Sequence, residues 1–317
     1  MYDKTNQERE HNMTQEEKFD ARYAKLANGR KQDAGTDLRD RAKGALWGLI
    51  IGDCLGSPVE FRSRTDHKWI DQMEPCPHWN LPKGYWTDDS SMAFCIMQAF
   101  IDHPKGFNPE HVAKHFANWM LHGEWSCTDN AFDVGTSCRN GIWDYVHAKS
   151  LKNGDEHSQG NGGIMRFAPS WFVARKLFAA KGEQTALMHD INDVTHNSSV
   201  ARKTIATLAE VFDEHIATGR QTAIETTAKD WRTANNSGWC VSTLDTALWA
   251  FNITNNFRDA LVAAVNLAGD ADTIGAVCGQ IAGSYYGYSA IPRKWLEAVK
   301  DWQKVDALIE KFLDMAL

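Results

Sequence analysis

The stretch that decides the fold is DTIGAVCGQIAGSYYG (residues 272–287). Small residues recur along it at helical spacing, namely Gly275, Ala276, Gly279, Ala282 and Gly283. A stripe of small side chains on one helix allows neighbouring backbones to approach very closely. The pattern therefore predicts a central helix against which the rest of the chain packs.

Helical periodicity continues outward from this segment in both directions. Apolar residues recur at steps of three and four between Leu38 and the end of the chain, as in Ala42, Ala45, Leu46, Leu49 and Ile50, in Val112, Phe116, Trp119 and Met120, and in Ile205, Leu208, Val211 and Phe212. Prolines and glycines mark helix boundaries, with Pro109 and Pro169 near first turns and Gly123, Gly182 and Gly219 after helices. The sequence contains no convincing run of alternating β-branched residues that would predict a strand. We expect an all-α, compact, single-domain helical bundle.

Composition narrows the function. The chain has 317 residues, a hydrophobic content of 43% and a net charge of −7, with no clustered lysines and arginines, which argues against a nucleic-acid-binding protein. Its 7 cysteines have irregular spacing and no CxxC pair, so we expect buried thiols in a reducing compartment and neither a disulfide framework nor a zinc site. The first thirty residues contain no stretch of signal-peptide or membrane-span length, which predicts a cytoplasmic protein that binds no membrane.

An N-terminal extension precedes the periodic part of the chain. Residues 1–37 are polar and charged, whereas residues 38–317 carry the apolar pattern of a folded domain. Within the extension, Phe19, Tyr23 and Leu26 have the spacing of a short amphipathic helix, although a mobile tail has the same composition.

Two acidic clusters stand at the beginnings of helices. The first is Thr87-Asp88-Asp89-Ser90, before a helix expected from about Ser91, and the second is Asp270-Ala271-Asp272-Thr273. Helix capping needs one side-chain oxygen, whereas each cluster offers three. Two carboxylates and a hydroxyl in each, without histidine or cysteine, are the ligands preferred by Mg²⁺ or Mn²⁺. The pair of clusters predicts a site for two divalent cations in a central cleft.

Two further segments carry polar groups on turns. Residues 52–61 (GDCLGSPVEF) end a helix in a turn with glycine and proline and then present Glu60. Residues 160–169 (GNGGIMRFAP) form a glycine-rich loop beside Arg166, whose free backbone N–H groups could bind a phosphate or pyrophosphate.

Taken together, these segments resemble the ADP-ribosylglycohydrolase family, especially its bacterial members related to the dinitrogenase reductase-activating glycohydrolases. The matching blocks, in the family order, are GALWGLIIGDCLGSPVEF (44–61), WTDDSSMAF (86–94), FDVGTSCRNGI (132–142), GNGGIMRFAP (160–169), THNSSVA (195–201), GWCVSTLDTALWAF (238–251) and NLAGDADTIGAVCGQIAGSYYG (266–287). The resemblance extends over almost everything from Gly44 to about Pro292.

The resemblance implies a role for individual residues. The two cations would be held by Thr87, Asp88, Asp89, Asp270, Asp272 and Thr273. ADP-ribose would lie against Asn161, Gly162, Gly163, Met165 and Arg166, with further contacts from His196 and Trp239. His196 is followed by Asn197 where the family commonly has proline, and a tryptophan such as Trp239 is more often a core residue than a ligand contact. Glu60 and Asp133 match family carboxylates near the scissile bond, and either could be the general base.

Two functions from different classes follow from this resemblance. The first is a hydrolase that removes ADP-ribose from mono-ADP-ribosylated protein side chains, with arginine expected from the bacterial type of motif. The second is an immunity-type binding protein whose extension blocks a partner ADP-ribosyltransferase toxin, with Phe19, Tyr23 and Leu26 as anchors. Both can hold for one protein. A dimetal phosphatase fits poorly because its usual histidine ligands are absent.

Overall fold

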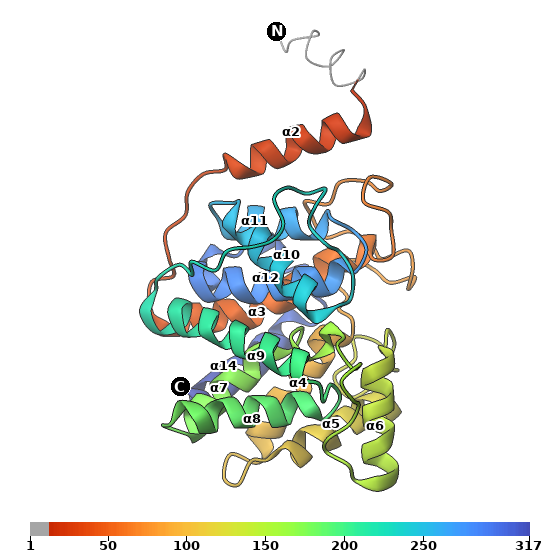
Figure 1. The fold of residues 1–317 in the computed structure, drawn as a ribbon, viewed down its shortest axis with the longest axis vertical. Coiled ribbons are helices and arrows are strands. Elements are labelled where there is room, and N and C mark those ends of the chain that lie inside the picture. Colours follow the sequence, from red (N-terminus) through yellow and green to blue (C-terminus); the bar gives the residue numbers. More distant parts are fainter. Residues whose placement is uncertain (1–12) are drawn as a thin grey trace.

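The computed structural model describes residues 13–317, and within them it contains helices and no strand. The helices are α2 (Gln15–Ala27), α3 (Leu38–Gly56), η1 (Ser57–Val59), α4 (Asp88–Asp102), α5 (Pro109–His122), α6 (Thr136–Ala148), η2 (Asn161–Gly163), α7 (Phe167–Leu177), α8 (Lys181–Asp193), α9 (Ser199–Phe212), η3 (Asp213–Thr218), α10 (Cys240–Asn252), α11 (Phe257–Val265), α12 (Ala271–Tyr286), η4 (Tyr288–Ala290), α13 (Arg293–Leu296) and α14 (Trp302–Ala316). The predicted all-α bundle is confirmed (Figure 1).

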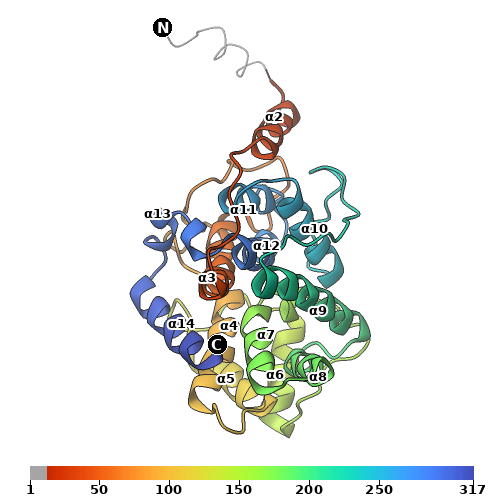
Figure 2. The same ribbon diagram turned by 90° about the vertical axis from the view of Figure 1, so that its left-hand side faces the viewer.

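The centre of the bundle is the contact between α3 and α12, which lie side by side in both views (Figures 1 and 2). Glycines recur every four residues on both helices and face each other across the contact. A Cβ atom added to Gly48 would stand 2.0 Å from the carbonyl oxygen of Gly279, and one added to Gly52 would stand 1.9 Å from that of Gly275. Because no side chain fits between them, the two backbones touch directly. The stripe on residues 272–287 therefore does mark the central helix.

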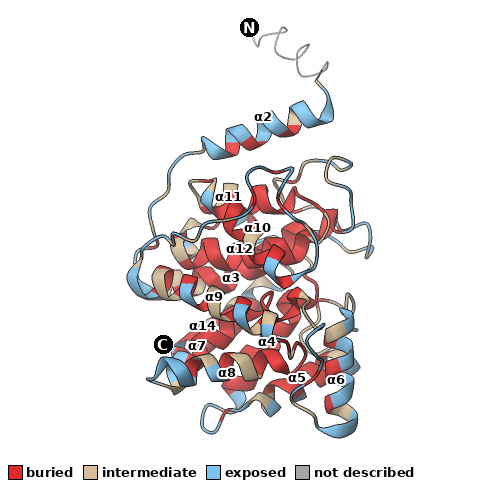
Figure 3. Cartoon of the chain, in the orientation of Figure 1, coloured by how far each residue is buried: buried red, intermediate tan, exposed pale blue. Residues whose placement is uncertain are grey.

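Helices α4, α10 and α11 contact this pair, and α5 and α8 pack farther out, on α4 and α7. In Figure 3 the buried residues concentrate on α3, α12, α4 and α7, while α6 and α8 expose one face. All seven cysteines are free and buried, as expected. None of the helices within residues 13–317 is long and apolar enough to cross a bilayer.

Helix α2 is part of the folded body. A capping box between Thr14 and Glu17 begins it, and the buried Phe19 ring packs against Trp69 and Trp231. The hydroxyl of Tyr23 donates to the carbonyl oxygen of Ala263 at 2.9 Å. The amphipathic helix predicted in the extension is thus present.

The burial of this stripe has a consequence for partner binding. Phe19, Tyr23 and Leu26 are buried against the chain itself, so they are not free to anchor a partner as the docking hypothesis requires. The first part of the extension, residues 1–12, lies outside the described residues.

Two boundaries differ from the sequence prediction. Helix α4 begins at Asp88 rather than near Ser91, so both acidic residues of the first cluster lie in its first turn. Gly182, which the pattern places after a helix, is the second residue of α8. By contrast, Pro109 is the first residue of α5, and Gly123 and Gly219 end helices in the left-handed conformation that glycine favours.

Candidate active site

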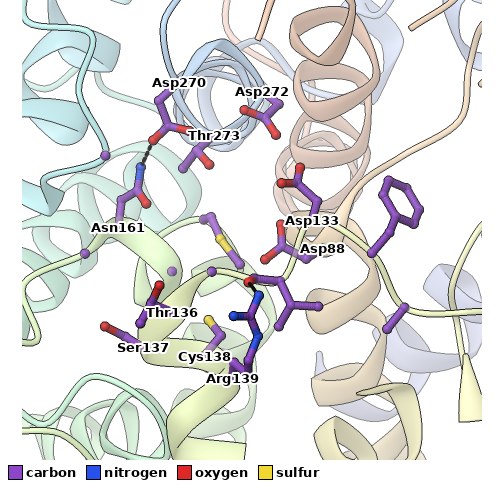
Figure 4. A pocket seen from close by; sticks show the side chains of 18 of the residues that line it. Asp88, Asp133, Thr136, Ser137, Cys138, Arg139, Asn161, Asp270, Asp272 and Thr273 are labelled. Carbon is purple, nitrogen blue, oxygen red and sulfur yellow. Dashed lines mark hydrogen bonds between the residues drawn. The ribbon is translucent and has the colours of Figure 1, made fainter. Parts of the chain in front are cut away.

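A cavity of about 840 Å³ opens where the C-terminal end of α3 meets the N-terminal ends of α4 and α12. Glu60 and Phe61, which follow η1, line it together with residues from α4, the 131–139 segment, the glycine-rich loop and α12. In Figure 4, Asp88, Asp133 and Asp272 face one common space, with Thr136–Arg139 on another side of it. The predicted acidic clusters and the glycine-rich loop therefore share one cavity.

Glu60 is positioned by a short β-bridge. Helix η1, which contains Pro58, follows α3 directly and delivers Glu60 beside Gly269. The N–H of Phe61 donates to the carbonyl oxygen of Gly269 at 2.7 Å. Because Gly269 directly precedes Asp270, this bridge brings the end of α3 next to the acidic beginning of α12. Glu60 is buried there, and Trp79 Nε1 donates to its Oε2 at 3.3 Å.

Asp53, one turn before the end of α3, holds the first acidic cluster in place. Its carboxylate accepts hydrogen bonds from the N–H of Thr87 at 2.9 Å and from the hydroxyl of Thr87 at 3.0 Å. It also accepts from the N–H and hydroxyl of Ser90, at 3.1 and 2.6 Å. Asp53 is fully buried and satisfied by these donors. The beginning of α4 is thereby tied to α3.

The second cluster sits at the start of α12. Asp270 is the residue before the helix and accepts a hydrogen bond from Asn161 Nδ2, which connects α12 to the glycine-rich loop (Figure 4). The hydroxyl of Thr273 lies 3.4 Å from Asp89 Oδ2, and that of Thr87 lies 3.4 Å from Asp272 Oδ2. Residues nearly two hundred positions apart are thus interleaved as one cluster.

Asp133 completes the cluster from a loop. Its backbone has φ 55°, a left-handed conformation that aspartate tolerates better than most residues. Glu60, Asp133 and Asp272 each place a carboxylate oxygen so that all three lie within 4.8 Å of one another. The closest group of carboxylates therefore joins the two predicted catalytic residues to one predicted metal ligand.

Burial and mutual repulsion perturb these carboxylates strongly. Burial, together with the charge of Asp133, raises the pKa of Glu60 to about 9. Burial and the charges of Asp53 and Asp270 raise the pKa of Asp133 to about 7. Burial likewise raises the pKa values of Asp88, Asp89 and Asp272 well above the ordinary range. Without a positive charge among them, these groups resist ionisation together.

Three carboxylate oxygens in the cluster are buried and have no hydrogen-bond partner, namely Asp89 Oδ1, Asp133 Oδ2 and Asp272 Oδ1. A buried acceptor without a donor is costly, so each oxygen is short of a positive partner. The atoms that could bind a metal ion in the group of Glu60, Asp133 and Asp272 are carboxylate oxygens, and the group contains neither histidine nor cysteine. This chemistry fits a hard divalent cation.

The comparisons with known proteins identify the fold. A family model described as ADP-ribosylglycohydrolase matches residues 34–316. The chain belongs to this family. It is 34% identical over 299 residues to the ADP-ribosylarginine hydrolase Tri1 of Pseudomonas putida (strain GB-1). This match covers 87% of this chain and 79% of that relative. It is 30% identical to the ADP-ribosyl-[dinitrogen reductase] glycohydrolase of Rhodospirillum rubrum, with coverages of 89% and 97%.

A solved structure supports the same assignment. The chain superimposes on an ADP-ribosylglycohydrolase-related protein complex with a TM-score of 0.74 at 29% sequence identity, covering 89% of this chain and 99% of that one. The resemblance seen in the sequence blocks is therefore confirmed at the level of family and fold.

Some residues to which the family pattern assigns a role in metal or ligand binding do not line the cavity. Asn161, Gly162, Met165 and His196 line it, together with Glu60, Asp88, Asp133, Asp270, Asp272 and Thr273. Thr87 and Asp89 are buried and do not line it, and the Thr87 hydroxyl lies 3.3 Å from Asp89 Oδ2. Gly163 faces Asn192 and not the cavity. Trp239 is 44% exposed beside the lining residue Gly238, and its Nε1 donates to Gln159.

Arg166 occupies a different place from the one expected. It is 1% exposed, does not line the cavity, and its guanidinium lies over the Phe116 ring. Its Nη2 donates to the hydroxyl oxygen of Thr195, which also forms a hydrogen bond with His196 Nδ1 at 2.7 Å. Burial and the charge of Arg166 lower the pKa of His196 to about 3, so the ring is neutral. Arg166 thus orients His196 instead of facing a ligand.

Four residues that sequence reasoning did not single out also shape the site. Asp53 lies within the matched block 44–61, and Arg139 lies within the block 132–142 and lines the cavity. Phe61 and Trp79 also line it. Trp79 lies in the segment between η1 and α4, which has no periodic pattern from which its position could be deduced.

Proposed function

We propose that this chain is a metal-dependent hydrolase that removes ADP-ribose from mono-ADP-ribosylated proteins, with arginine as the modified side chain. The observation that carries the proposal is the convergence of Glu60, Asp133 and Asp272 in a cavity large enough for a nucleotide-sized ligand. The names of two relatives, the Tri1 proteins of Pseudomonas putida and Serratia proteamaculans, specify ADP-ribosylarginine hydrolases, which supports arginine.

The proposed cofactor is a pair of divalent cations, Mg²⁺ or Mn²⁺. Thr87, Asp88, Asp89, Asp270, Asp272 and Thr273 would hold them. The buried oxygens without donors in Asp89 and Asp272 support this choice. Bound cations of this kind would supply positive charge to substrate oxygens and orient a water molecule. They would also relieve the repulsion that raises the pKa values of the cluster.

The glycine-rich loop and its neighbours are proposed to hold ADP-ribose. Neutral His196 places Nε2 beside Gly160 and Gly162, where it can form a hydrogen bond with a ligand. Asn161 is fixed by Thr243 and Asp270. Arg139 is the lining residue that carries a guanidinium, so we assign the diphosphate contact to Arg139 and not to Arg166.

Cleavage at the ribose carbon develops positive charge on the sugar, which the surrounding carboxylates stabilise. A carboxylate at hydrogen-bond distance from the attacking water would remove its proton. We propose Glu60 or Asp133 for this role, with Trp79 orienting Glu60 and a left-handed backbone orienting Asp133. We do not extend the proposal to a blocking role of the N-terminal extension, because its apolar anchors are buried.

The test is incubation of the purified protein with an arginine-ADP-ribosylated protein and, in parallel, with a serine-ADP-ribosylated one. We expect release of free ADP-ribose from the arginine-linked substrate with Mg²⁺ or Mn²⁺, and loss of release in EDTA. Glu60→Gln and Asp133→Asn, assayed separately with metal binding measured, identify the base by the larger loss of kcat. No release from either substrate in the presence of metal would refute the proposed function.

A further inference from the structure

Phe61 combines two features that cost stability. Its side chain is 60% exposed, and its backbone has φ 60°, a left-handed conformation that bulky residues rarely adopt. The hydrogen bond from its N–H to Gly269 holds this conformation. Folding alone explains neither an exposed aromatic ring nor its strained backbone. Strain and exposed apolar surface of this kind are concentrated at binding sites.

The ring belongs to a continuous row of aromatic side chains. The Phe61 and His78 rings have centroids 4.6 Å apart, His78 and Trp79 also 4.6 Å, and Trp79 and Phe132 5.4 Å. We call Phe61, His78, Trp79 and Phe132 the aromatic wall. Phe61, Trp79 and Phe132 line the cavity, and exposure decreases from Phe61 and His78 to the half-buried Trp79 and Phe132. The wall therefore leads from solvent into the cavity.

The wall ends at the carboxylates. Trp79 Nε1 donates to Glu60 Oε2, Phe61 follows Glu60 in the chain, and Phe132 precedes Asp133. Of the polar groups assigned to ADP-ribose, Asn161 and His196 come from other segments of the chain, and Arg139 lies on α6, which follows Phe132 and Asp133. A substrate with its glycosidic bond at Glu60 and Asp133 would thus place its ADP-ribose half against these polar groups. Its other half would lie along the aromatic wall.

We propose that the aromatic wall binds the modified side chain and the adjoining polypeptide of the protein substrate, with Phe61 as the outermost contact. This inference rests on the proposed function. A guanidinium is planar and cationic, so it stacks on aromatic faces and is attracted by the carboxylates at the inner end. The exposed Phe61 ring then provides an apolar surface for the substrate's backbone and neighbouring side chains.

The test compares two substrates that differ only in the polypeptide, an arginine-ADP-ribosylated protein and free ADP-ribosyl-arginine. Phe61→Asn removes the ring and suits the left-handed backbone, so the variant should fold. We expect its kcat/KM on the modified protein to fall about tenfold, mainly through KM, as for loss of one aromatic contact residue at an interface. The loss on free ADP-ribosyl-arginine should be at least fivefold smaller, and Phe61→Trp should retain most of the activity on the protein.

The matched control is Leu38→Asn, which removes an apolar side chain that is 44% exposed at the other end of α3, roughly 27 Å away along the helix. It should change neither value. Equal losses on both substrates with Phe61→Asn, or no loss on the modified protein, would overturn the proposal. Failure of the unsubstituted protein to cleave either substrate would instead refute the proposed function, and with it this inference.

Discussion

The glycine contact between α3 and α12 and the cavity end of the same two helices differ in how well their groups are packed and hydrogen-bonded. Along most of their length the helices touch through glycines, and the closest approaches leave no room for a methyl group. At the cavity end the same helices bring together Asp53, Glu60, Asp270 and Asp272, and some oxygens there have no partner. Tight packing leaves the carboxylates no freedom to move apart. The fold thereby maintains a repulsive cluster that is ready for a cation.

The largest effect is expected where the packing is tightest. Gly48→Ala places a Cβ atom 2.0 Å from the carbonyl oxygen of Gly279, so the helices must separate. We expect a loss of more than about 3 kcal/mol in the free energy of unfolding, or no soluble protein. Denaturant unfolding followed by circular dichroism measures it.

The matched control for this prediction is Gly182→Ala. Gly182 is exposed in the first turn of α8 with no atom within 4 Å of the added Cβ. Alanine there should stabilise the protein by up to about 1 kcal/mol because of its higher helix propensity. If Gly48→Ala unfolds at the same denaturant concentration as the unsubstituted protein, the direct contact between α3 and α12 is wrong.

At the cavity end the expected effect is on activity and not on the fold. Asp88→Asn or Asp272→Asn removes one charge with little change in shape, and we expect hydrolysis to fall by about a thousandfold or more because a metal ligand is lost. The metal-free variants should melt at higher temperature, since repulsion is relieved. Asp66→Asn, at an exposed position, should alter neither property. Full activity in the Asp88/Asp272 double variant would contradict the cation site.

Both the glycine contact and the acidic cluster leave a signal in the sequence. Periodicity predicts the helices, and the stripe in residues 272–287 correctly predicts the central one. The same spacing at Gly44, Gly48, Gly52 and Gly56 is a second signal that identifies its partner helix. Both acidic clusters also show in the sequence, because their ligand chemistry lies within a few residues.

Arg166 and the aromatic wall show what could not be predicted. An arginine after a glycine-rich loop suggests a phosphate ligand, yet the side chain of Arg166 turns inward to Thr195 and Phe116, which come from other segments. Trp79 reaches Glu60 through a segment without regular structure. Similarly, periodicity predicts helix α2 but not the surface on which Tyr23 and Phe19 pack. Long-range contacts decide each of these placements.

The smallest effect concerns pH. Because the pKa values of Asp133 and Glu60 are raised to about 7 and about 9 in the folded metal-free protein, these groups bind more protons when folded than when unfolded between roughly pH 4 and pH 9. Stability must therefore fall as pH rises through this window. We expect the Tm in EDTA to be several degrees lower at pH 9 than at pH 6, and Mg²⁺ to restore more of it at pH 9, where it binds ionised carboxylates. Asp272→Asn should flatten the dependence in EDTA, whereas Gly182→Ala should leave it intact. A Tm in EDTA that rises with pH, or an equal gain from Mg²⁺ at both pH values, would show that the cluster is not the source of the repulsion.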